Sequence, residues 1–224
     1  NLLAAQNSGM VKIVFATGNK GKLREAAEIL GEGFELLCPA DLGIFEDIEE
    51  TGDTLTENSI IKAKYIYEKT GLNCFADDTG LEVDALDGAP GVHSARYAVE
   101  VALRNGDTGL ASRADHDFSA NINALLSELA KKPGADRKAR FRSVVTLIWN
   151  GEMHFFEGSF EGRIAESRSG TNGFGYDPVF VPDDCPDKTV AELPESFKNE
   201  HSHRAKALKE MAAWLSEAQA SAQI

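Results

Sequence analysis

The chain has 224 residues, 42% of them hydrophobic, which suffices for one substantial core or at most two small lobes that share it. Lys and Arg number 23 against 36 for Asp and Glu, so the net charge is −13. Such an acidic protein is not expected to bind nucleic acid or anionic membranes through its overall charge. A bound anion would need a local group of basic side chains or a metal.

Three cysteines without a C-x-x-C motif suggest neither a disulfide framework nor a zinc ribbon, and they fit a reducing compartment. No apolar run approaches the ~20 residues of a membrane span. The opening NLLAAQNSG lacks the positive start of a signal peptide. We expect residues 1–9 to be disordered or a cloning remnant, with Met10 as the natural start. The cytoplasm is the predicted location.

The first recognisable unit is a strand, a glycine loop and a helix. VKIVFA (11–16) is typical of a buried strand, TGNKGK (17–22) follows it, and LREAAEIL (23–30) has its apolar residues at helical spacing. Successive backbone amides at a helix start, with two lysines beside them, suit an anion. The Walker A pattern is not present. An ordinary strand-to-helix turn explains the same residues. This motif alone does not decide between such a turn and an anion-binding loop.

The second unit repeats this logic with a helix before a strand. TLTE (54–57) matches a capping box, and the helix that follows is expected to end at Gly71. NCFADDTGLEVDAL (73–86) then predicts a strand that is broken by its two aspartates and resumed after them. The order of helices and strands indicates an α/β fold with a partly parallel sheet.

The aspartates of this strand, Asp77 and Asp78, lie directly next to each other, and Glu49 and Glu50 precede them in IEETG. Mg²⁺ is usually held by one or two carboxylates together with substrate phosphates and water. Adjacent carboxylates at a strand end are costly unless a cation or a shared proton relieves them. The acids therefore allow a metal site, but a solvated turn at DDTG explains them at least as well, and this motif alone does not establish the site.

The second half of the chain has fewer motifs. DGAPGVHSARY (87–97) is predicted to be a loop, and residues 98–118 are polar and are expected to form a mobile surface segment. An amphipathic helix is predicted at 120–132. Asn150–Gly151 joins two apolar runs and indicates a hairpin. A packed terminal helix is expected at 202–218.

A glycine-rich loop, RSGTNGFGYDP (168–178), carries an aromatic side chain next to glycines, which suits the stacking of a base. Lys198 and the triplet Ser202, His203 and Arg204 add donors for carbonyl oxygens or phosphates. The alternatives are a core role for Phe174 and a helix start capped by Ser202.

Taken together, these stretches resemble the inosine triphosphate pyrophosphatase family, which acts on non-canonical purine nucleoside triphosphates. The matching motifs are FATGNKGKLREAAEIL, EETGDTLTENSIIKAK, FADDTGLEVDALDGAPGVHSARYA, GTNGFGYDPVF and KNEHSHRAKAL. They occur in the family's order over roughly residues 11 to 210. Five motifs in order make the resemblance specific.

The resemblance implies an elongated mixed β-sheet with flanking helices, forming two lobes around a central cleft, usually in a homodimer. It predicts a single domain over residues 10–218 with a short tail at 219–224. It also implies a reaction in which a purine nucleoside triphosphate and water give the nucleoside monophosphate and pyrophosphate with Mg²⁺. ITP, dITP and XTP are the implied substrates, and the role is nucleotide-pool sanitation.

The family's functional residues carry over by motif. The resemblance implies that Asp78 is the general base and a metal ligand, with Glu50, its neighbour Glu49, or Asp77 as further ligands. The implied substrate contacts fall into a triphosphate-binding group, a single hydroxyl and a base-binding group. These are Thr17, Gly18, Asn19, Lys20, Gly21, Lys22 and Lys62; then Thr79; and finally Phe174, Gly175, Tyr176, Asp177, Lys198, His203 and Arg204.

The sequence departs from the family pattern in three places. Thr79 replaces a serine found in many relatives, His201 stands where relatives usually carry an apolar residue, and the chain is longer than is typical between Tyr97 and Asn121. A titratable His201 could make base recognition depend on pH, or could simply face solvent. Two other hypotheses stay open: a hydrolase of modified pyrimidine triphosphates, and a nucleotide-binding protein without catalysis.

Overall fold

The computed structural model describes residues 10–107, 109 and 117–222. The expectation that residues 1–9 are disordered or a remnant lies outside these residues, as does part of the predicted surface segment at 98–118. Across the described part of the chain, no helix combines the length and apolar character needed to cross a membrane. All three cysteines are free thiols.

The strands form one mixed sheet in the order β2-β1-β3-β4-β5-β6. β1 pairs in parallel with both β2 and β3, whereas β5 and β6 are antiparallel. The predicted mixed sheet with flanking helices is thereby confirmed, while the predicted cleft stays a prediction. The strand bounds are β1 Val11–Phe15, β2 Phe34–Leu37, β3 Cys74–Val83, β4 Lys138–Trp149, β5 Glu152–Ile164 and β6 Phe180–Pro182.

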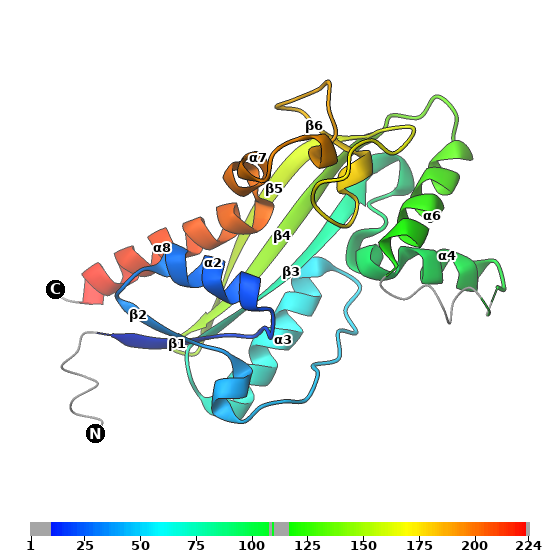
Figure 1. The fold of residues 1–224 in the computed structure, drawn as a ribbon. Helices are drawn as coiled ribbons and strands as arrows, with labels where there is room; N and C mark the ends of the chain where they lie inside the picture. Colours follow the sequence, from blue (N-terminus) through cyan, green and yellow to red (C-terminus); the bar gives the residue numbers. More distant parts are fainter. Residues whose placement is uncertain (1–9, 108, 110–116, 223–224) are drawn as a thin grey trace. The chain divides into compact units, whose positions relative to one another are not determined.

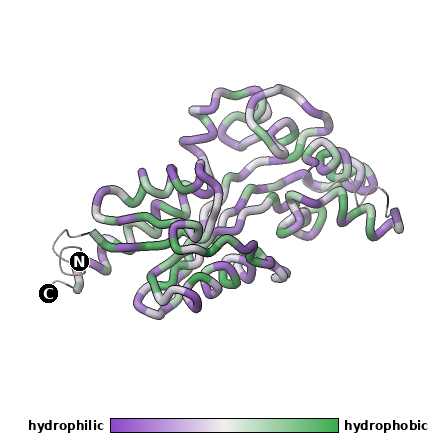
Figure 2. Tube along the Cα trace, turned by 60° about the horizontal axis from the view of Figure 1, so that its bottom comes forward, coloured by the Kyte–Doolittle hydropathy of each residue, from purple (hydrophilic) through white to green (hydrophobic). Residues whose placement is uncertain are grey.

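The helices begin and end largely where the sequence signals indicate. Asn19 caps α2, Thr54 caps α3 through the backbone amide of Glu57, and Gly71 ends α3 in the left-handed conformation. In Figure 2 the helices alternate between hydrophilic and hydrophobic residues, as expected of elements with one buried face. The α-helix bounds are α2 Lys20–Leu30, α3 Leu55–Thr70, α4 Tyr97–Arg104, α6 Phe118–Ala130, α7 Glu195–His201 and α8 His203–Ala222.

The chain divides into two compact units, each made of separate stretches of sequence. Unit 1 holds the described residues up to Asp78, Ser143–Gly158 and the residues from His203 on. Unit 2 holds Thr79–Arg142 and Ser159–Ser202. The prediction of a single domain over residues 10–218 stays a prediction.

In unit 1 the sheet is covered on both faces. Ile13 and Phe15 of β1 pack into a cluster with α2 and α8, which run side by side in Figure 1. Val14 and Ala16 face the opposite way, into a cluster with α3. Because successive strand residues point to opposite faces, a strand buried on both sides reads as a continuous apolar run. VKIVFA has this pattern.

Unit 2 has its own core, in which α6 and the loops pack on the remaining parts of β3, β4 and β5. Leu125 of α6 and Phe180 of β6 are fully buried, and Phe160 of β5 contacts the Phe180 ring at a centroid distance of 5.4 Å. Tyr97, at the start of α4, belongs to the same cluster.

Three local predictions are corrected by the structure. β3 runs without interruption through both aspartates, and it ends before Asp84–Leu86, which forms a short 3₁₀ helix. Residues Gly91–Arg96 of the predicted loop also form a 3₁₀ helix. Part of the predicted mobile segment is the helix α4, whose residues Val99 and Ala102 are buried. The small buried residues of α4 carried this signal, but the surrounding polar residues hid it.

Candidate functional site

In unit 1 the glycine loop after β1 leads directly into α2. The side chain of Asn19 accepts a hydrogen bond from the backbone amide of Lys22 at 3.0 Å, and Thr17 Oγ1 accepts one from the amide of Asn19 at 3.1 Å. Gly18 has open space where a side chain would stand. The loop therefore presents the start of an eleven-residue helix, with exposed Lys20 beside it, a known arrangement for binding an anion.

Asp77 and Asp78 point to opposite faces of the sheet, because they are neighbours in a continuous strand. Asp77 faces α2, where its two carboxylate oxygens accept hydrogen bonds from Lys22 Nζ at 3.2 and 3.1 Å. Only 1% of Asp77 is exposed. Burial disfavours the charged carboxylate, but the ammonium groups of Lys22 and Lys62 outweigh burial and lower its pKa. Asp77 is thus a charged carboxylate whose charge is balanced by the ion pair with Lys22.

Asp78 faces α3 instead, and its surroundings differ. Burial, the largest influence, raises the pKa of the Asp78 carboxyl to about 6, and the nearby Glu50 carboxylate acts in the same direction. Lys62 and a hydrogen bond from Asn58 oppose this shift without cancelling it. A carboxylate with a raised pKa is a stronger proton acceptor than an ordinary aspartate.

Lys62 of α3 connects these groups. Its ammonium donates to the backbone carbonyl of Asp77 and forms an ion pair with Glu50 at 2.7 Å. Burial disfavours the charged ammonium, but Asp77 and Glu50 together raise the pKa of Lys62. Glu50, rather than its neighbour Glu49, is therefore the upstream carboxylate drawn towards Asp78.

The described residues contain no group of three or more His, Cys, Asp or Glu side chains arranged to hold a metal ion. The pair of carboxylates from Asp78 and Glu50 nevertheless fits Mg²⁺ in one respect. This ion is commonly held by one or two carboxylates and completes its shell with water and substrate phosphates. Asp77 does not join the pair, because it is turned to the other face and is bonded to Lys22.

The predicted residues of the SHR triplet lie at the start of α8 in unit 1. Arg204 Nε donates to Glu25 of α2 at 2.6 Å, and His203 is half-buried. The backbone at His203 lies so close to Gly158 of β5 that a Cβ on Gly158 would collide with the His203 carbonyl. Ser202 directly follows α7 and directly precedes α8.

In unit 2 the glycine-rich loop is built around the carboxylate of Asp177. The same oxygen, Oδ2, accepts the backbone amide of Phe174 at 3.0 Å and the ammonium of Lys198 at 2.7 Å. Gly173 has a φ of +74°, and a Cβ on it would collide with this carboxylate. Asp177 is 3% exposed. The loop shape therefore depends on a buried charge and a glycine together.

Phe174 and Tyr176 of this loop have opposite environments. Phe174 is 73% exposed, and Lys198 Nζ lies 3.8 Å from the centroid of its ring. Tyr176 is buried: its hydroxyl donates to the carbonyl of Ser94 at 2.5 Å, and burial raises its pKa. An aromatic face for stacking is thus presented by Phe174, while Tyr176 anchors the loop. Gly175, between them, has a φ of +63°, and Thr79, the first residue of unit 2, is half-buried on β3.

Sequence reasoning missed Asn58, which is buried at the first turn of α3. Its side-chain oxygen accepts the amide of Gly52 at 2.7 Å, which fixes the loop that carries Glu50. It is also hydrogen-bonded to Asp78. An asparagine among the buried residues of the helix was the available signal, since a buried amide must find partners.

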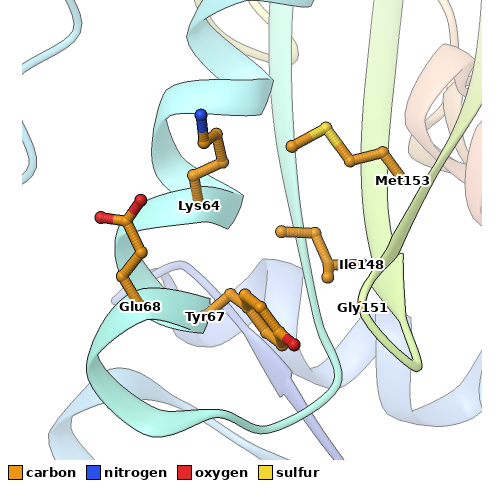
Figure 3. Close-up of a pocket in the computed structure, with 6 residues that line it drawn as sticks. All are labelled: Lys64, Tyr67, Glu68, Ile148, Gly151 and Met153. Atoms are coloured by element: carbon orange, nitrogen blue, oxygen red, sulfur yellow. The ribbon is translucent and has the colours of Figure 1, made fainter.

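A hollow of about 270 Å³ lies elsewhere in unit 1, between α3 and the β4–β5 hairpin (Figure 3). Lys64, Tyr67 and Ile148 point into it, and Met153 of β5 closes it. None of the residues that line it is a predicted site residue, so it gives no support to those predictions.

A strand, glycine loop and helix with two lysines, together with a half-buried carboxylate of raised pKa, define an α/β protein with the features of a phosphate-binding enzyme. Residues 13–214 match the model of the Ham1 family. The chain belongs to the Ham1 family, which confirms the resemblance found in the sequence.

Among curated relatives, the dITP/XTP pyrophosphatase of Flavobacterium johnsoniae is 46% identical over 201 residues, covering 90% of this chain and 96% of the relative. The dITP/XTP pyrophosphatase of Porphyromonas gingivalis is 47% identical over 202 residues, covering 90% of this chain and 96% of the relative. Among solved structures, a HAM1 protein from Coxiella burnetii has a TM-score of 0.79 and 37% identity, covering 93% of this chain and all of that one.

Proposed function

We propose that this protein is a nucleoside-triphosphate pyrophosphatase that hydrolyses non-canonical purine nucleotides, namely ITP, dITP and XTP. The relatives named dITP/XTP pyrophosphatase over nearly the whole chain support this substrate class. The observation that carries the chemistry is Asp78, a half-buried carboxylate with a pKa of about 6 beside Lys62 and Glu50. The products are the nucleoside monophosphate and pyrophosphate.

In the proposed reaction, water attacks the α-phosphorus and the bond to the bridging oxygen of the β-phosphate breaks. Asp78 accepts the proton of the attacking water. The helix start at Lys20 and the ammonium groups of Lys22 and Lys62 offset the negative charge of the triphosphate. Near neutral pH most Asp78 side chains are deprotonated, because their pKa is about 6, and so they can act as the base.

Mg²⁺ is the proposed cofactor, and Asp78 with Glu50 are its proposed protein ligands. When bound, the ion neutralises phosphate charge and orients the reacting groups. Glu49 and Asp77 are weaker candidates, since Glu50 holds the ion pair with Lys62 and Asp77 is bonded to Lys22.

The purine is proposed to stack on Phe174, with Lys198, His203 and Arg204 as donors to its edge. A 6-oxo group accepts hydrogen bonds, whereas the 6-amino group of adenine would leave buried donors unpaired. Guanine shares the 6-oxo group, so its rejection requires a further contact. Gly175, Tyr176 and Asp177 then act by shaping the loop that carries Phe174. A homodimer and a cytoplasmic location complete the proposal.

The test is product analysis with Mg²⁺ on ITP, XTP, GTP, ATP and dUTP, with pyrophosphate and orthophosphate measured separately. We expect pyrophosphate with IMP or XMP, and little product from ATP or GTP. Pyrophosphate from dUTP but not from ITP would assign the protein to pyrimidine nucleotides instead. Orthophosphate as the first product would mean attack at the terminal phosphorus, and the role given to Asp78 would be wrong.

A further inference from the structure

His201, the last residue of α7, is packed between aromatic rings and an acidic side chain. Its imidazole stacks on Phe197 of the same helix, with ring centroids 4.2 Å apart and planes inclined by 19°. Phe160 of β5 lies beyond it at a centroid distance of 6.1 Å. The side chain is 26% exposed. His201 therefore does not simply face solvent; it joins α7 to the sheet of unit 2.

The two ring nitrogens of His201 meet groups that both require a donor. Nδ1 lies 2.8 Å from the backbone carbonyl oxygen of Phe197, which can only accept, so Nδ1 carries a hydrogen. Nε2 lies 3.3 Å from a carboxylate oxygen of Asp184, which follows β6. A neutral imidazole has only one N–H, so its Nε2 lone pair would face an anion. The imidazolium has an N–H at both positions and satisfies both neighbours.

Charged groups on α7 and on β5, which packs against His201 through Phe160, have partners of their own. On β5, Glu161 accepts from Arg140, and Arg163 donates to the carbonyl of Pro186. On α7 itself, Lys198 is bonded to Asp177. Within the described part of unit 2, Asp184 is the charged side chain whose contact with His201 depends on the proton at Nε2.

His201 is linked to the glycine-rich loop through α7. Lys198 stands one turn earlier on this seven-residue helix, and its ammonium holds Asp177 at 2.7 Å while covering the ring of Phe174. A change in the position of α7 therefore changes the position of the Lys198 ammonium relative to Phe174.

We propose that His201 is a positioning residue whose charge sets how firmly α7 holds Lys198 over Phe174. When His201 is protonated, the contact with Asp184 is attractive and α7 is fixed to the loop after β6. When it is neutral, an Nε2 lone pair faces the Asp184 carboxylate and that end of α7 is released. Histidine changes charge between about pH 5 and 8. The consequence for catalysis rests on the proposed function: substrate affinity falls as pH rises, while the chemical step does not depend on His201.

The kinetic test compares KM and kcat for ITP from about pH 6 to 8 in four proteins. These are the wild type, His201→Phe, Asp184→Asn and the matched control Asp183→Asn. We expect KM of the wild type to rise by about 1.5- to 5-fold, the range for a partly exposed ion pair. His201→Phe keeps the stacking but cannot titrate, so it should lack the part of the KM rise that depends on His201. Asp184→Asn should reduce the rise, Asp183→Asn should retain it, and kcat should follow one profile in all four.

A second readout does not require activity. Backbone amide NMR shifts of α7 should titrate with pH in the wild type and in Asp183→Asn, but not in His201→Phe. Titration of α7 amides that persists unchanged in His201→Phe would overturn the inference, as would an equal rise of KM in that variant. If the α7 shifts behave as expected but ITP is not hydrolysed, the positioning role of His201 stands and the proposed function fails.

Discussion

Each of the two units buries an aspartate against a lysine, yet the two pairs serve different ends. In unit 1, Asp77 and Lys22 are held in a continuous strand, and alternation turns the next residue, Asp78, to the opposite face. In unit 2, Asp177 and Lys198 are held in a loop, and the carboxylate itself shapes the backbone around Gly173. The strand thus leaves a second carboxylate available for the proposed chemistry, whereas the loop uses its only carboxylate for structure.

The largest effect is expected when Asp78, the carboxylate proposed to act in the chemistry, is replaced with asparagine. We expect turnover of ITP to fall by at least about 100-fold, the usual contribution of a general base, because the amide cannot accept the proton. Nucleotide binding should stay largely intact, which equilibrium titration with ITP would measure. Wild-type turnover in this variant would remove Asp78 from the mechanism.

The neighbouring replacement, Asp77→Asn, should act mainly on stability. It leaves Lys22 beside an uncharged group in a nearly buried pair, a change that costs about 3 kcal/mol in comparable sites. Urea denaturation of the two asparagine variants would measure the contrast. If Asp77→Asn kept its stability but lost affinity for Mg²⁺, Asp77 would be a metal ligand and not a structural partner.

Stability should also depend on pH through Asp78. Its pKa is about 6 in the folded protein and about 4 in an unfolded chain, so the folded state binds the proton more tightly. Wild-type stability should therefore fall as pH rises from about 4 to 6, by at most about 3 kcal/mol for this two-unit shift. Asp78→Asn should lack this loss and be the more stable protein at neutral pH, as thermal unfolding at both pH values would show. An equal pH dependence in both proteins would mean that Asp78 is not strained by burial.

The smallest effect is expected in the loop of unit 2. Gly173→Ala combines an unfavourable φ of +74° with a collision against Asp177, and should cost about 1–3 kcal/mol and raise KM for ITP. Gly134→Ala is the matched control, because its φ is +78° but a Cβ there meets no atom within 4 Å. If both variants lost the same stability and neither changed KM, the contact with Asp177 would not shape the site.

Much of the fold could be predicted from local patterns, and the site only in part. The capping box at Thr54 and the stop at Gly71 are local hydrogen-bond signals, so α3 was predicted close to its observed bounds. The cap at Asn19 was not predicted, and α2 begins at Lys20, inside the predicted glycine loop. The two aspartates were placed at a strand end because their charge suggested solvent. Strand alternation, with Lys22 on one face and Asn58 on the other, allows the strand to continue through them.

The contacts that decide roles are long-range, and no pattern in the sequence gives them. Lys62 and Glu50 lie 12 residues apart, and their pairing distinguishes Glu50 from Glu49. The two aromatic residues of GFGYDP look equivalent in the sequence, but Tyr176 is hydrogen-bonded to Ser94, 82 residues away, while Phe174 is exposed. The surroundings of His201 likewise depend on Asp184 and Phe160, which the topology brings together.

The division of unit 1 into separate stretches has a consequence for biosynthesis. Its core packs Ile13 and Phe15 of β1 against Leu208, Met211 and Leu215 of α8, which are translated much later. Contacts of such high sequence separation form late, and exposed apolar surface favours aggregation until they do. The face of β1 that carries Ile13 and Phe15 therefore stays uncovered until α8 has been synthesised.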